Sequence, residues 1–352
     1  WDTVHEWGDS VEKMFWERTI ITGLRDESKD AERAVKSLLV AGRPYRALQV
    51  ACLAEFRPKE TSKGPQVVPP DLLIRILEAL LEQALDDEWY PPDRGSISHY
   101  VETVFRLLDE SSVDKTRIIR LEFALLPFLE NTERGANQLV EAVKTTPAVF
   151  VELLKLVYRA KDEEEGQLNE RKQAVARNAY SALSNLRFVP GTIWEDTSEE
   201  ETLRKRFDGD IAFVEGEVNS DQLATWVEEA RQIARDCGRL EVCDLHIGTL
   251  FAYAPAESPG IWPCEAVRRV LESAESDALE NGLHTGVVNK RGVHYLGRGG
   301  EQERTIAARF AEFAENARSK WPRTAALLRG IAEDFERMAR REDEESLRDE
   351  FQ

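Results

Sequence analysis

The chain has few of the features that mark membrane or nucleic-acid-binding proteins. Its 352 residues carry 47 lysines and arginines against 66 aspartates and glutamates, which gives a formal net charge of −19. A field of this sign repels phosphate, so we expect no nucleic-acid partner. The most apolar stretch, residues 148–157, is interrupted by Glu152 and Lys155. It does not approach the ~20 apolar residues of a membrane span, so we expect no membrane segment.

Cysteine is also scarce, and its spacing does not favour a metal site. Four scattered thiols in a chain of this size are typical of a reducing compartment, so we expect a cytoplasmic protein. Zinc prefers four soft ligands at short spacings. The nearest approach to such a set has Gly238 between its first two members, which lie six residues apart, and consists of Cys237, Cys243, His246 and Cys264. We therefore predict buried thiols and neither a metal nor a cofactor.

Catalytic motifs are missing as well. The sequence contains no phosphate-binding G-x-x-x-x-G-K-[ST], no G-x-S-x-G, no H-E-x-x-H and no paired C-x-x-C. Ser10 and Lys13 fit S-x-x-K, but the partner motif K-T-G is absent. A catalytic pair cannot be chosen among 66 acidic residues, because it depends on burial that separates two pKa values. A non-enzymatic role is therefore favoured over an enzymatic one.

Helical periodicity is what the chain has in abundance. Apolar residues recur at three- and four-residue steps, and glycines and prolines end and begin the periodic stretches, as at Gly42-Arg-Pro44. Successive helix pairs are spaced by roughly 40 residues, the size of helical repeat units, without a repeated motif. We predict an all-α fold, an irregular solenoid-like array of antiparallel helix pairs similar to TPR or HEAT arrays. A short non-helical insertion is expected near residues 283–300.

Changes of composition suggest three regions. Residues 161–171 form a charged linker, and residues 187–219 combine Pro190-Gly191 with an acidic run. We expect an N-terminal helical lobe over 1–160, a linker helix and irregular acidic segment over 161–219, and a C-terminal helical lobe over 220–352. Within the irregular segment, residues 211–214 are expected to form a short strand or a buried loop.

The segment 282–300 is the most unusual part of the sequence. It contains six glycines, which permit left-handed backbone and close approach, together with two histidines and three cationic side chains. Its end precedes a predicted helix, where an anion finds free N–H groups. The candidates for an interface or anion contact are Lys290, Arg291, His294 and Arg298. The alternative is a structural connection in which these cations pair with neighbouring acids.

Six short motifs resemble the C-terminal helical region of large, mostly uncharacterised multidomain bacterial proteins. They are Gly42-Arg-Pro44, Glu122-Phe-Ala-Leu-Leu-Pro127, Phe150-Val-Glu-Leu-Leu154, Val227-Glu-Glu-Ala-Arg231, Asn289-Lys-Arg-Gly292 and Trp321-Pro-Arg-Thr-Ala-Ala326. The resemblance covers most of the chain, and its motifs are structural rather than catalytic. Such proteins are similar in architecture to bacterial anti-phage defence proteins, in which a helical sensor follows an effector or NTPase module. The resemblance implies that this chain is the C-terminal part of something larger.

Three functions remain open at this point. The preferred one is a non-enzymatic protein-interaction or sensor scaffold, with a protein or other domains of the parent chain as partner. The second is a helical enzyme domain or anion-binding site centred on 283–300, in which His284 joins the four candidates. The third is an oligomerisation module formed by the last predicted hairpin, residues 305–338, whose apolar stripes would otherwise pack against each other.

Overall fold

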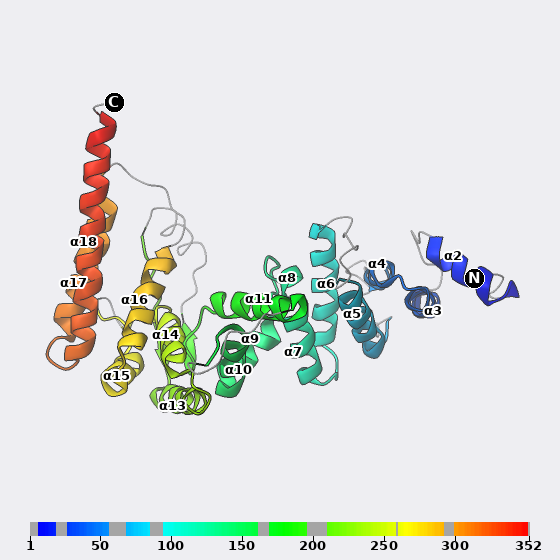
Figure 1. Ribbon diagram of the computed structural model, residues 1–352, viewed down its shortest axis with the longest axis horizontal. Helices are drawn as coiled ribbons and strands as arrows, with labels where there is room; N and C mark the ends of the chain where they lie inside the picture. Colours follow the sequence, from blue (N-terminus) through cyan, green and yellow to red (C-terminus); the bar gives the residue numbers. More distant parts are fainter. Residues whose placement is uncertain are drawn as a thin grey trace. The chain divides into compact units, whose positions relative to one another are not determined.

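The computed structural model describes residues 6–18, 27–55, 68–84, 94–160, 169–195, 210–257, 260–291 and 299–350 (Figure 1). Helices make up most of this part of the chain, and the only sheet in it has two short strands. The all-α fold class is confirmed. None of the described helices combines the length and the apolar character needed to cross a membrane.

The chain divides into two compact units, Trp1–Glu141 and Ala142–Gln352. The helices of unit 1 are α2 (Asp9–Arg18), α3 (Glu27–Val40), α4 (Pro44–Glu55), α5 (Pro70–Ala84), α6 (Arg94–Asp109), α7 (Lys115–Ala124) and α8 (Leu126–Leu129). Helix α9 (Asn137–Thr145) crosses the boundary between the units. The turn between α3 and α4 is the predicted one: Gly42 has a φ of 70°, and Pro44 begins the next helix.

The remaining elements of the described residues lie in unit 2, of which α17 and α18 run side by side as the expected long hairpin (Figure 1). Its helices are α10 (Pro147–Val157), α11 (Glu170–Ser184), α13 (Ser220–Asp236), α14 (Leu240–Phe251), α15 (Glu265–Ala274), α16 (Asp277–Arg291), α17 (Glu301–Ala317) and α18 (Pro322–Glu350). Strands β1 (Thr192–Glu195) and β2 (Gly216–Val218) pair antiparallel. Residues 211–214, expected as a strand or buried loop, form a loop that leads into β2.

The boundary between the units lies earlier than the expected breaks at 161–219. Helix α10 packs on α13. The Trp226 indole N–H of α13 also donates to the Val143 carbonyl near the end of α9 at 3.2 Å. The rings of Phe150 and Trp226 lie 5.2 Å apart between their centroids. This buried contact places residues 142–160 in the same unit as the C-terminal helices, although a charged stretch separates them in the sequence.

The expected non-helical insertion near 283–300 is corrected in its first half, because α16 continues as a helix to Arg291. The glycines of α16 serve close packing against α14 rather than a loop. A Cβ on Gly286 would lie 2.7 Å from the Ala252 Cβ, and a Cβ on Gly248 would lie 2.8 Å from the Gly282 Cα. A Cβ on Gly282 would collide with the Leu245 carbonyl oxygen. Residues 292–298 lie outside the described part of the chain.

Candidate functional site

The four candidates from the sequence divide between the described and undescribed parts of the chain. Lys290 and Arg291 form the last two positions of α16, where a cation is favoured by the helix dipole. His294 and Arg298 lie outside the described residues. The structure therefore places two of the four side chains, and both are engaged inside unit 2.

Arg291 joins the end of α16 to the first turn of α17. Its guanidinium lies 2.5 Å from Glu303 Oε1, and both residues are buried, at 8% and 2% exposure. Two charges that leave water together depend on each other, because removing either partner strands the other in an apolar surrounding. This pair matches the structural alternative for the candidate segment, in which its cations pair with neighbouring acids.

Lys290 lies between two aromatic rings. Its Nζ donates to the Ala252 carbonyl at 3.2 Å and stands 5.3 Å and 5.5 Å from the ring centroids of Phe213 and Tyr253. Burial lowers the pKa of the Lys290 amine to about 8, against the opposing charge of Glu195. One carbonyl oxygen and two ring faces thus take the place of water around the Lys290 amine. Cation–π attraction to the rings favours its protonated form.

Arg309 on α17 approaches the same Phe213 ring, with its guanidinium carbon 5.7 Å from the centroid. It also donates to Asp210 Oδ2 and to the Ile211 carbonyl, each at 3.0 Å. Lys290 and Arg309 therefore fix the extended segment 210–216 from two different helices. Sequence reasoning found Lys290 but missed Arg309, because an arginine in a mixed-charge helix carries no local signal.

An aromatic cluster surrounds Phe213. The Phe213 centroid lies 5.1 Å from that of Trp262, 5.7 Å from that of Phe310 and 5.2 Å from that of Phe313. The last two contacts are edge-to-face, which aromatic quadrupoles favour. Together with Lys290 and Arg309, these rings hold Phe213 among side chains from several elements of unit 2.

The cysteine and histidine set considered for zinc does not assemble. Cys243 and Cys264 are buried, and burial raises the pKa of their thiols to about 12 and about 11. The His246 ring shares a 2.9 Å hydrogen bond with the Tyr158 hydroxyl, and burial lowers the pKa of the imidazole to about 4. Within the ranges that the structure describes, no group of three or more metal-ligating side chains comes together.

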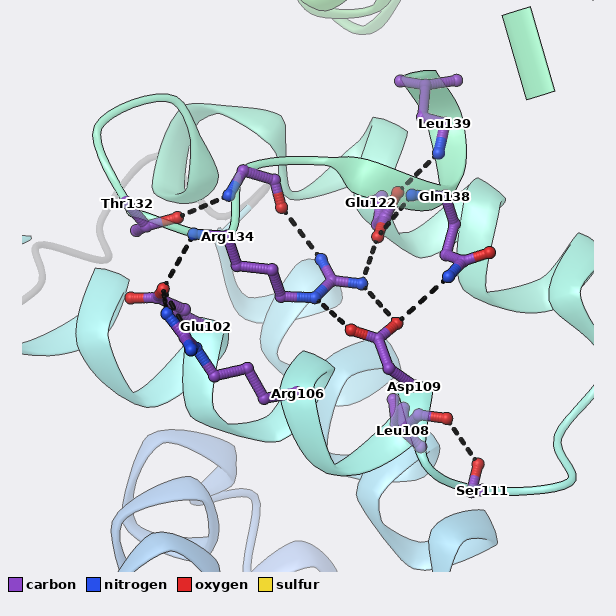
Figure 2. A network of polar contacts seen from close by, with 11 residues as sticks. Glu102, Arg106, Leu108, Asp109, Ser111, Glu122, Thr132, Arg134, Gln138 and Leu139 are labelled. Carbon is purple, nitrogen blue, oxygen red and sulfur yellow. Dashed lines mark hydrogen bonds and ion pairs between the residues drawn. The ribbon is translucent and has the colours of Figure 1, made fainter. Parts of the chain in front are cut away.

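A second polar cluster lies in unit 1, around Arg134 (Figure 2). The guanidinium donates to both carboxylate oxygens of Asp109, at 2.6 and 2.7 Å, and lies 2.6 Å from Glu122 Oε1. It also stacks over the Phe105 ring, 5.1 Å from the centroid. Arg134 and Glu122 are buried, so the cluster ties the loop before α9 to α6 and α7.

Glu122 also holds the first turn of α9. The backbone N–H groups of Gln138 and Leu139 donate to its two oxygens at 3.3 and 2.7 Å, as Figure 2 shows. Burial raises the pKa of Glu122, while Arg134 and the two amides oppose that rise. The side chain thereby satisfies helix N–H groups that have no partner within α9. The Arg134 and Glu122 side chains thereby connect α6, α7 and the start of α9.

Unit 2 also presents exposed apolar side chains and an open groove. Ile193 and Trp194, adjacent on β1, are 58% and 52% exposed. An open groove of about 500 Å³ lies between the start of α10 and the start of α13, with Trp226 among its lining residues. Its other lining residues are Lys144, Thr145, Pro147, Asn219, Asp221, Gln222, Thr225 and Glu229.

Comparison of the chain with protein families, with curated proteins and with solved structures finds no match.

Proposed function

We propose that this chain acts as a protein-interaction or sensor scaffold. The observation that carries the proposal is the pair Ile193 and Trp194, two large apolar side chains that are more than half exposed side by side on a short strand. Tryptophan is among the residues most enriched at the energetic centres of protein interfaces. Consecutive residues of a regular strand face opposite sides of a sheet, but the β1–β2 register shifts between Thr192 and Trp194, as at a β-bulge, which re-aims side chains. We call the two exposed side chains Ile193 and Trp194 the β1 patch.

The cationic side chains that an anionic substrate would contact are less accessible than the β1 patch. Arg291 is paired with Glu303, and Lys290 is covered by the Phe213 and Tyr253 rings. These contacts lend the enzymatic or anion-binding alternative at 283–300 less support than the scaffold. The oligomerisation alternative also draws less support, since Phe310 and Phe335 stack on each other within the α17–α18 hairpin.

The setting of the scaffold is part of the same proposal. The four cysteines form no disulfide, which suits a reducing compartment such as the cytoplasm. The sequence resemblance supports a place in the C-terminal part of a larger bacterial protein, with anti-phage defence as the context to test first. The partner is then either a separate protein or another domain of the parent chain.

The test compares partners captured by immobilised wild-type chain and by an Ile193→Ser/Trp194→Ala variant. Tyr180→Ala is the matched control, because Tyr180 is 57% exposed on α11 and lies outside the β1 patch. We expect one defined protein to be lost at least tenfold with the double variant and retained with the control. That protein, once purified, should bind wild type directly. A captured set that is the same for all three chains would contradict the proposal.

A further inference from the structure

Residues 210–216 lie in unit 2 in the manner of a bound peptide. Up to Val214 the segment belongs to neither a helix nor a strand. Three kinds of contact hold it: a charged side-chain pair, an aromatic side chain among other aromatics, and backbone hydrogen bonds. These are the contacts by which extended peptides are recognised in grooves and at sheet edges.

The charged contact is made by Asp210, the first residue of the segment. The Arg309 guanidinium pairs with the Asp210 carboxylate at 3.0 Å and also donates a hydrogen bond to the neighbouring Ile211 carbonyl at 3.0 Å. One guanidinium thereby recognises an acidic side chain and the direction of the backbone that follows it. A fixed fork of N–H donors suits arginine to this task more than lysine.

The aromatic contact reads the fourth residue. Phe213 stands against Trp262, Phe310 and Phe313, with Lys290 over its ring at 5.3 Å. Backbone contacts complete the recognition, since the Ala256 N–H donates to the Val214 carbonyl at 2.7 Å and its carbonyl accepts from the Gly216 N–H at 3.4 Å. Glu215 and Ala256 form a parallel bridge at the same place.

The residues that contact the segment are also held by contacts that do not involve it. The Trp262 indole N–H donates to the Ala254 carbonyl at 2.8 Å. Phe310 stacks on Phe335 of α18, with centroids 6.1 Å apart and planes 9° from parallel. The Lys290 amine is bound to the Ala252 carbonyl. Contacts of this kind do not depend on the segment, and a preorganised site costs less to order around an occupant.

We propose that the residues contacting the segment, namely Ala256, Trp262, Lys290, Arg309, Phe310 and Phe313, form a peptide-binding site whose resident ligand is the chain's own segment 210–216. The partner that it fits is an extended peptide with an acidic residue three positions before an aromatic one. Such a peptide competes with Asp210 and Phe213 for Arg309 and the aromatic cluster. This inference rests on the proposed scaffold function and names a class of partner for it.

The test uses the full chain with Phe213→Ala, which removes the aromatic side chain of the segment and leaves the residues around it unchanged. The probe is a fluorescent peptide with the sequence of residues 210–217, Asp-Ile-Ala-Phe-Val-Glu-Gly-Glu. We expect saturable binding, at least tenfold tighter for Phe213→Ala than for wild type, measured by fluorescence anisotropy. Replacing the peptide's phenylalanine by alanine, or adding Arg309→Gln to the protein, is expected to weaken binding at least tenfold.

Circular dichroism and a melting curve establish that the Phe213→Ala variant is folded. If it is not, Asp210→Asn loosens the charged contact alone, and the peptide is expected to bind this variant more tightly than wild type. Absence of saturable binding to a folded variant would overturn the inference, as would a dimer formed by exchange of the segment between two copies. Either result leaves the β1 patch experiment untouched, so the two proposals fail separately.

Discussion

At the scale of single residues, Arg134 shows how much of unit 1 depends on one guanidinium. It joins Asp109 at the end of α6 to Glu122 in α7, and Glu122 in turn holds the amides that begin α9. No sequence pattern marks this role, because Arg134 stands in a short polar loop next to Glu133 and Gly135. Charged loops of this kind are usually solvated, and only the fold brings the distant carboxylates to it.

The first prediction concerns this cluster. Arg134→Met leaves Glu122 buried without its counter-charge, so we expect a loss of about 3–5 kcal/mol in the free energy of unfolding. Urea denaturation followed by circular dichroism measures it. Arg106→Met is the control, because Arg106 is an exposed cation paired with Glu102, and exposed pairs contribute about 1 kcal/mol or less. Equal losses for the two variants would show that burial of Glu122 does not matter.

The second prediction concerns His246. Its pKa is lowered to about 4 in the folded chain from an ordinary value of 6.5, so the folded state disfavours the protonated ring. The stability that depends on the neutral ring is complete above pH 6.5 and is lost as pH falls toward 4. We expect His246→Gln to reduce the fall in melting temperature between pH 7 and pH 4.5.

The comparison for His246 is His99→Gln, which changes an exposed histidine of α6 in unit 1. Its melting temperature is expected to fall with pH as steeply as that of wild type. If His246→Gln and wild type lose the same number of degrees on acidification, the imidazole is not the group that titrates.

At the scale of elements, helix beginnings were the most predictable feature. Pro44, Pro147 and Pro322 each begin a helix, as expected for a residue that lacks an N–H where none is needed. The end of α16 was predicted wrongly because glycine has two uses that a sequence does not separate. Gly282 and Gly286 are four residues apart, and on a helix that spacing makes a smooth face for a neighbouring helix.

The third prediction tests this use of glycine. Gly282→Ala adds a Cβ that collides with the backbone of Leu245 on α14, which no side-chain rotation relieves. We expect a loss of about 1–3 kcal/mol in the free energy of unfolding, despite the better helix propensity of alanine. Gly330→Ala on α18 is the matched control, because nothing lies within 4 Å of its added Cβ. That variant should gain about 0.4–1 kcal/mol, and destabilisation of similar size in both would contradict the packing argument.

The site around Phe213 was only partly predictable, because its members are far apart in the sequence. Lys290 stood out because it lies in a conspicuous stretch, but its neighbours Phe213 and Tyr253 come from segments that are remote in sequence. Arg309 and Asp210 are separated by 99 positions, so nothing local pairs them. The burial of a cationic side chain and the choice of its partner are properties of the folded unit. They decide whether the side chain can bind an anion or instead forms an internal ion pair.

At the scale of the whole chain, the net charge of −19 acts on every part of the molecule. Like charges at this density repel one another and oppose compaction, and salt screens them over a Debye length of about 10 Å at 0.1 M. Individual exposed ion pairs weaken in salt too, but each contributes about 1 kcal/mol or less. Relief of the general repulsion is expected to be the larger effect.

The fourth prediction follows from that balance. Raising NaCl from about 20 mM, where the Debye length exceeds 10 Å, to about 300 mM is expected to raise the melting temperature at pH 7.5. The same series near pH 5 serves as the control, because the chain is close to its isoelectric point of about 4.9 there. Scanning calorimetry measures both. A decrease at pH 7.5 would mean that specific ion pairs outweigh the general repulsion.

The crossing of α14 and α16 bears on how this chain can change over evolutionary time. Gly248, Gly282 and Gly286 admit no side chain without moving one backbone from the other. Surface positions of the same helices are free to drift, so descendants of a common ancestor can lose overall similarity while these three positions stay fixed. We therefore expect distant homologues to retain glycine at the positions of Gly282 and Gly286, four residues apart, and of Gly248, 34 residues upstream of Gly282.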